Sequence, residues 1–155
     1  MKKITTLALV LLASQTFADT TGTLLLQGEV AEELAIVVTP EAGHDSLDLS
    51  ASPTDLKVAS VNEKSNSNTG YNIQVRSANA GELKNGTLDS LAYEISYDGG
   101  SFVSPTAVDQ VVKTQSGGAI YDNDSDVDIK YTGKPAASMV EGVYEDTLTF
   151  TISAN

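Results

Sequence analysis

The residue types that most often carry catalysis are sparse in this sequence. His44 is the only histidine, and it stands beside Asp45 and Ser46 in a polar stretch that follows Pro40. A catalytic triad needs three side chains gathered around one point in space, and sequence neighbours do not supply that geometry. The chain has no cysteine, which removes thiol catalysis and thiolate metal sites. We therefore predict that His44 is a solvent-exposed turn residue and that the protein is not an enzyme.

One acidic stretch has the composition of a metal site. Asp122–Asp128 alternates acids with other residues, and calcium takes six to eight oxygen ligands. The helical calcium-loop pattern is not met, because Val127 occupies the position of its glycine and Gly133 that of its final glutamate. We predict a solvated acidic turn and strand face with no metal, and calcium binding remains the alternative. No phosphate-binding loop or zinc pattern is present, so no cofactor is expected.

The elements that would position these residues are strands. Apolar residues alternate with polar ones in four clear rows, which predicts strands with one buried face. The rows are Tyr71/Ile73/Val75, Leu91/Tyr93/Ile95/Tyr97, Val127/Ile129/Tyr131 and Leu148/Phe150/Ile152. Shorter alternations predict further strands at Leu34–Val38, Leu47–Leu49 and Leu56–Val58.

Turn signals separate these rows at fairly even spacing. Asn85-Gly86 and Asp98-Gly99-Gly100 are typical of tight turns, and no stretch has a helical stripe of ten or more residues. Many short strands with one apolar face indicate two packed sheets. We expect one all-β domain over residues 34–155, an immunoglobulin-like β-sandwich.

The first residues have the features of a secretory signal. Lys2 and Lys3 precede an apolar run, and Ala18 is the expected cleavage point. The run is too short to span a bilayer, and no second run follows, so no transmembrane segment is expected. We predict a signal peptide over residues 1–18 and export. Without Lys2 and Lys3, seven basic residues face 21 acidic ones, a net charge of −14 that disfavours nucleic acid as a partner.

The segment after the predicted cleavage point alternates too. Leu24, Leu26, Gly28 and Val30 would share one face of an extended segment. A glycine in the apolar row of a strand usually marks close approach by another chain segment. Residues 19–33 are therefore either an ordinary first strand of the sandwich or an extension that pairs elsewhere.

Both ends of the chain resemble one protein family. Gly22–Val30 resembles the N-terminal extension of fimbrial subunits assembled by the chaperone–usher route, in which a glycine interrupts an apolar row. Gly142–Ile152 resembles the Gly-x-Tyr-x-Asp-Thr ending of the same subunits, and Glu63–Leu83 is similar to cysteine-free members. The resemblance implies a pilin-type sandwich that lacks its last strand, with residues 19–33 as a donor strand for the next subunit.

The resemblance also implies partners and site residues. The partners would be other copies or related subunits, a periplasmic chaperone and an outer-membrane usher, and the destination would be a surface fimbria or capsule-like fibre that supports adhesion or biofilm formation. The donor strand would bury Leu24, Leu26, Gly28 and Val30, and the groove or chaperone edge would include Gly142, Tyr144, Leu148, Phe150 and Ile152. The alternative is a monomeric exported β-sandwich that binds glycan or protein through loops such as Ser65–Gly70 or Asp98–Phe102.

Overall fold

The computed structural model describes residues 21–155. The predicted signal peptide, residues 1–18, and the start of the 19–33 extension lie outside the described residues. Residues 31–155 form one compact unit, and residues 21–33 carry no strand. The strands and one short 3-10 turn are β1 (Leu34–Pro40), β2 (Leu56–Ser65), β3 (Gly70–Ser77), β4 (Glu82–Asn85), β5 (Asp89–Tyr97), β6 (Gln110–Ser116), β7 (Tyr121–Tyr131), η1 (Ala136–Ser138) and β8 (Leu148–Ala154).

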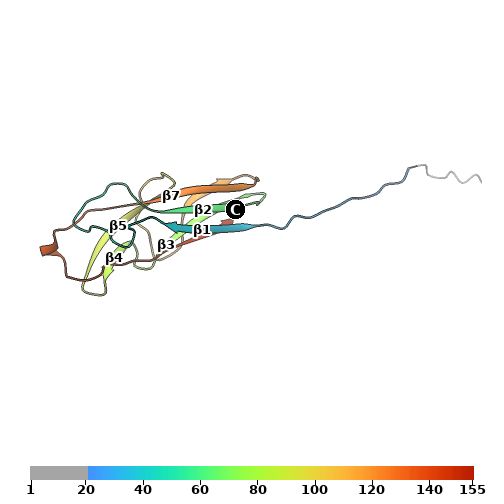
Figure 1. The fold of residues 1–155 in the computed structure, drawn as a ribbon. Helices are drawn as coiled ribbons and strands as arrows, with labels where there is room; N and C mark the ends of the chain where they lie inside the picture. The colour runs from blue at the N-terminus through green and yellow to red at the C-terminus, as the bar shows by residue number, and fades with distance from the viewer. Residues whose placement is uncertain (1–20) are drawn as a thin grey trace, which may run out of the picture. The chain divides into compact units, whose positions relative to one another are not determined.

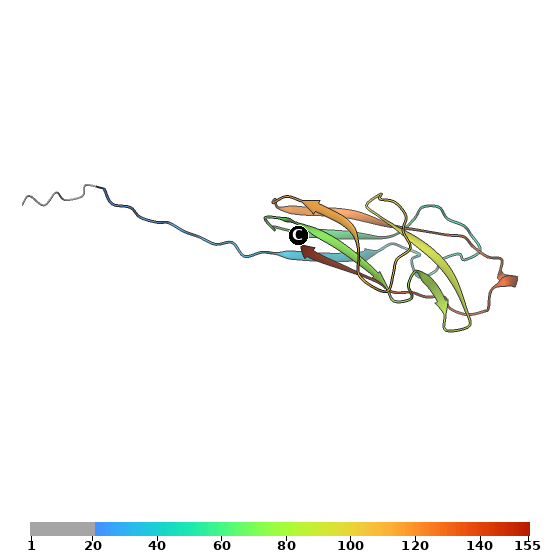
Figure 2. The same cartoon turned by 180° about the vertical axis from the view of Figure 1, so that it is seen from behind.

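The strands form two antiparallel sheets, as the alternating rows predicted. One sheet has the order β1-β2-β7-β5-β4 and the other β6-β3-β8 (Figures 1 and 2). The sheets enclose the apolar core between them, so the all-β, two-sheet prediction is confirmed. No helix in residues 21–155 is long and apolar enough to cross a membrane.

The four clear rows lie where their alternation placed them. Tyr71, Ile73 and Val75 of β3 are fully buried, and Ile95 of β5 and Val127 of β7 are at most 1% exposed. The polar residues between them face outward, because successive side chains of a strand point to opposite faces. The Asn85-Gly86 turn joins β4 to β5, with Gly86 in the left-handed conformation at φ 55°.

The strand predicted at Leu47–Leu49 is wrong. These two leucines lie in an irregular segment between β1 and β2, where they are half-buried against the core. Asp48 stabilises this segment instead, since its carboxylate accepts hydrogen bonds from both the backbone N–H and the hydroxyl of Ser50. A local side-chain hydrogen bond of this kind competes with strand pairing.

Candidate functional site

The terminal strand β1 leaves its core-facing side partly uncovered. Leu34 and Val38 pair directly with Ser65 and Val61 of β2, which are both buried. Directly opposed residues of an antiparallel pair point to the same face, so Leu34, Ile36 and Val38 point into the sandwich. Yet Val38 is 43% exposed, and the other two are only half-buried.

The terminal strand β8 repeats this pattern in the other sheet. Phe150 and Ile152 pair with Val75 and Ile73 of β3, which are fully buried. Leu148, Phe150 and Ile152 therefore also point inward, but each remains half-buried. The Phe150 ring packs against that of Tyr97, with ring centroids 5.9 Å apart, but this contact does not bury the whole inward row of β8.

These two rows lie next to each other. β1 and β8 are close in space, as Figure 2 shows, although they belong to different sheets. Each pairs with one neighbour only, β1 with β2 and β8 with β3, so each leaves one backbone edge without a strand partner in the described part of the chain. We call the inward residues of β1 and β8 together the β1–β8 seam. An added strand here would have apolar surface to cover and backbone groups to pair with.

The predicted donor-strand residues are exposed. Leu24, Leu26 and Val30 are each more than 80% exposed, and so is Leu25 on the opposite face of the alternation. An added Cβ at Gly28 would meet no atom within 4 Å. Four apolar side chains with this exposure make a segment whose burial against another surface would be favourable.

Two of the predicted groove residues lie outside β8. Gly142 and Tyr144 belong to the loop between η1 and β8, and the Tyr144 hydroxyl donates to the Asp89 carboxylate at 2.6 Å. That hydrogen bond lowers the pKa of Asp89, with further bonds from two backbone N–H groups. Gly142 packs tightly on Asn85, where a Cβ would come within 2.4 Å of the amide nitrogen. The loop residues singled out by the family resemblance thus contact the ends of β4 and β5.

Asp146 attaches the start of β8 to the rest of the sandwich. Its carboxylate accepts hydrogen bonds from the Ser77 hydroxyl at 2.5 Å and from the Tyr93 hydroxyl at 2.6 Å. It also accepts the backbone N–H groups of Asn79 and Thr147. Burial is the main cause that raises the pKa of Tyr93, so this phenol stays a donor. One carboxylate therefore fixes where β8, and with it one side of the seam, lies.

A buried carboxylate links the two sheets. Glu63 of β2 is fully buried, and it accepts hydrogen bonds from the hydroxyls of Tyr71 on β3 and Tyr97 on β5. Lys113 Nζ of β6 lies 3.0 Å from its Oε2 and 2.9 Å from Asp98. Sequence reasoning missed this network, because Glu63 looks like any polar residue of an alternating strand. Removing one partner of such a buried pair typically costs about 3–5 kcal/mol.

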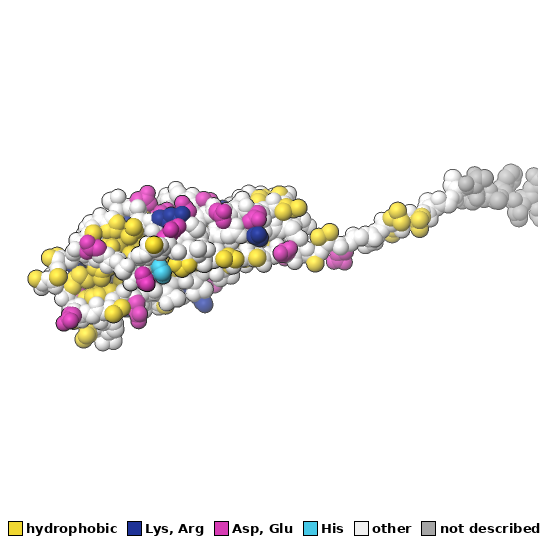
Figure 3. Space-filling model, in the orientation of Figure 1, with side chains coloured by type: hydrophobic (Ala, Val, Ile, Leu, Met, Phe, Trp, Pro, Cys, Tyr) yellow, Lys and Arg dark blue, Asp and Glu magenta, His cyan; other side chains and the backbone are white. Residues whose placement is uncertain are grey.

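The acidic stretch and His44 lie at the surface. Asp122–Asp128 falls within β7, and its alternate aspartates face outward while Val127 is buried. Lys64 pairs with Asp122, Lys57 with Asp126, and Asn62 donates to Asp122 and Asp124. Within residues 21–155, no three His, Cys, Asp or Glu side chains are placed to hold a metal ion. The imidazole of His44 is exposed, as Figure 3 shows in cyan, with Nδ1 2.9 Å from the Glu41 carbonyl oxygen.

No family model matches the chain, and no curated protein matches it.

Proposed function

We propose that this domain is a structural subunit of a surface fibre that polymerises by strand addition. The observation that carries the proposal is the unequal protection of its four terminal strands. β4 is only four residues long and includes a glutamate and a lysine, and β6 has Lys113 and a register shift against β3. Short length, charge and bulges are the features that keep sheet edges from pairing with other chains.

The other two terminal strands have none of these features. β8 has seven residues without a charge or proline, and its register against β3 is continuous. β1 also lacks charge, and its only proline is the last residue, Pro40. These two strands are the ones that border the β1–β8 seam. An edge that is long, uncharged and apolar is expected to be covered by a strand from elsewhere.

The exposed segment before β1 supplies a matching strand. Leu24, Leu26 and Val30 would each contribute about 1.5–3 kcal/mol on burial, or roughly 5–9 kcal/mol together, before backbone pairing. Gly28 would fit where the seam leaves no room for a side chain. The contact joins the front of one copy to the seam of the next, so it does not close on itself and generates a filament.

The remaining partners follow from the same resemblance in the sequence. Until a donor strand arrives, the seam is an aggregation hazard, and a periplasmic chaperone that covers it would keep the subunit soluble. An outer-membrane usher would then pass subunits to the cell surface, where the fibre supports adhesion or biofilm formation. In this proposal Leu148, Phe150 and Ile152 meet the chaperone first and the donor strand later.

A peptide-addition experiment tests the proposal. The acceptor is a chain that starts at Ala31, because Asn66 hydrogen-bonds to both the Ala31 carbonyl and the Glu33 N–H and so fixes the entry to β1. The donor is a synthetic peptide of residues 20–33, and native mass spectrometry measures the complex. We expect a one-to-one complex. A stably folded acceptor that does not bind the peptide would refute strand addition.

Matched peptides separate strand addition from general stickiness. Leu26→Asp places a charge in the row that faces the seam, whereas Leu25→Asp places it on the opposite face. The first change should abolish the complex and the second should leave it intact. Gly28→Arg should also block binding. Equal loss with Leu25→Asp and Leu26→Asp would indicate nonspecific hydrophobic association.

A further inference from the structure

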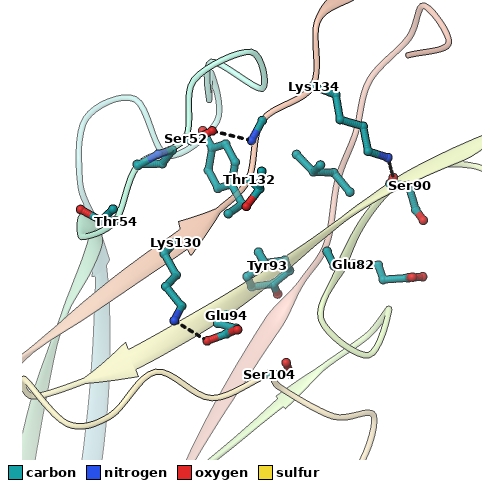
Figure 4. Close-up of a pocket in the computed structure, with 15 residues that line it drawn as sticks. Ser52, Thr54, Glu82, Ser90, Tyr93, Glu94, Ser104, Lys130, Thr132 and Lys134 are labelled. Carbon is teal, nitrogen blue, oxygen red and sulfur yellow. Dashed lines mark hydrogen bonds and ion pairs between the residues drawn. The ribbon is translucent and has the colours of Figure 1, made fainter. Parts of the chain in front are cut away.

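A cleft of about 800 Å³ lies over β4, β5 and the end of β7 (Figure 4). Its floor includes Ala92, which is exposed between the buried residues Leu91 and Tyr93, so the cleft opens on the outer face of the five-stranded sheet. The segment Ser52–Thr54 forms one wall. A volume of this size is in the range of small-molecule sites.

The cleft is deepest over Ala92, because its methyl side chain is short and the surrounding side chains of Glu82, Glu94 and Lys130 are long. Glu82 of β4 is directly opposite Ala92, and Glu94 of β5 is directly opposite Lys130 of β7. Both carboxylates are already paired: Glu94 lies 2.8 Å from Lys130, and Glu82 lies 3.2 Å from Lys84. The acids that line the cleft are therefore neutralised.

One cation of the cleft, whose charge acts on Asp89 only at longer range, has no carboxylate within ion-pair distance. Residues 21–155 contain seven lysines and arginines, and six of them have a carboxylate oxygen within 4.0 Å. Lys134 is the exception. It is half-buried, and its Nζ donates to the Ser90 carbonyl at 3.1 Å, as Figure 4 shows. An ammonium group has three N–H donors, so it can still receive an anionic group of a ligand.

The rest of the lining is rich in hydroxyl groups. A hydroxyl both donates and accepts hydrogen bonds, which suits the hydroxyls of a saccharide. The serine and threonine residues of the lining are Ser52, Thr54, Ser90, Ser104 and Thr132.

We propose that this cleft binds a carboxylated saccharide, a uronic acid or sialic acid unit, with its carboxylate at Lys134 Nζ. The ring hydroxyls would hydrogen-bond to the serine and threonine side chains and to Glu82. The cleft lies on the outer face of β4, β5 and β7, whereas the seam is made of the core-facing residues of β1 and β8. A filled seam would leave the cleft open, and copies repeated along a fibre would bind such a glycan multivalently.

Saturation-transfer difference NMR tests this site with the chain that starts at residue 19. The method detects the NMR signals of the ligand, so it can be used whether the protein is monomeric or assembled. The probes are glucuronate, N-acetylneuraminate, glucose and acetate. We expect transfer to the two acidic sugars and clearly less to glucose and acetate. Lys134→Gln should lower the affinity for the acidic sugars about five- to tenfold, while Lys134→Arg should retain binding.

Two further variants keep the test specific. Lys64→Gln removes a lysine that pairs with Asp122 away from the cleft, and it should leave binding unchanged. Ala92→Gln fills the floor and should abolish binding without touching Lys134. No transfer to either acidic sugar would overturn the proposal. So would equal binding of glucose or acetate, or equal losses from Lys64→Gln and Lys134→Gln.

Discussion

Replacing Asp146 with alanine tests how firmly β8 is attached, and with it one side of the seam. The change removes the acceptor of two hydroxyl donors in buried residues, Ser77 at 1% exposure and Tyr93 at 5%. A buried donor without a partner costs about 1–3 kcal/mol, so the pair costs about 2–6 kcal/mol. We expect the lower half of this range, because Asp146 is half-buried and water can reach its position. Of the two backbone N–H groups that also lose their acceptor, that of Thr147 is exposed and can be hydrated instead.

Equilibrium unfolding in urea, followed by circular dichroism, measures the loss. The matched control is Asp109→Ala, whose partner Arg76 is 4.0 Å away with both side chains about half exposed. It should change the free energy of unfolding by less than about 0.5 kcal/mol. Coincident midpoints at two protein concentrations would exclude a contribution from assembly. If Asp146→Ala matches the control, the hydrogen bonds do not hold β8 and the reasoning fails.

Three other changes have expected outcomes. The Tyr144 hydroxyl lowers the pKa of Asp89 from its ordinary 3.8, so Asp89→Asn should cost stability at neutral pH, and the gap in melting temperature should close as the pH falls below 3.8. A gap that persists in acid would contradict this. Burial, with nearby acids, raises the pKa of Asp128, so Asp128→Asn should raise the melting temperature at pH 7 and lose the gain below 3.8. A Cβ at Gly133 would lie 2.0 Å from a backbone carbonyl oxygen, so Gly133→Ala should cost about 1–3 kcal/mol, whereas Gly22→Ala, with nothing within 4 Å, should be neutral.

The strands that sequence reasoning identified are those whose burial follows alternation. Tyr71, Ile73 and Val75 alternate with polar residues in the sequence, and all three are buried in the structure. β6 was not predicted because residue type does not follow burial along it: Val111 is exposed, whereas Lys113 points inward to Glu63. β4 is too short for a period to register. Leu47 and Leu49 have the right spacing, but the local hydrogen bonds of Asp48 decided their conformation.

The seam was only partly predictable. The alternation predicts that Leu34, Ile36 and Val38 share one side of β1. It does not predict how far other strands cover that side. Coverage depends on which strands of the other sheet lie across from it, and this is a property of the topology. The cleft at Lys134 was not predictable at all, because it joins β4, β5 and β7 with the loop before β2. Single lysines and serines give no periodic signal.

If residues 24–30 act as the proposed donor strand, the entry to β1 bears on whether they fill the seam of their own domain or that of another copy. For this segment to cover the seam of its own domain, the chain would have to reverse within the few residues before Leu34. Asn66 opposes such a turn, because its side chain bonds to the Ala31 carbonyl and the Glu33 N–H, and its own N–H donates to the Glu33 carbonyl. One residue makes all three bonds, and a reversal that moved residues 31–33 away from Asn66 would break them. Under the proposed strand addition, the hydrogen bonds at the start of β1 therefore favour a second copy as the acceptor, as a filament requires.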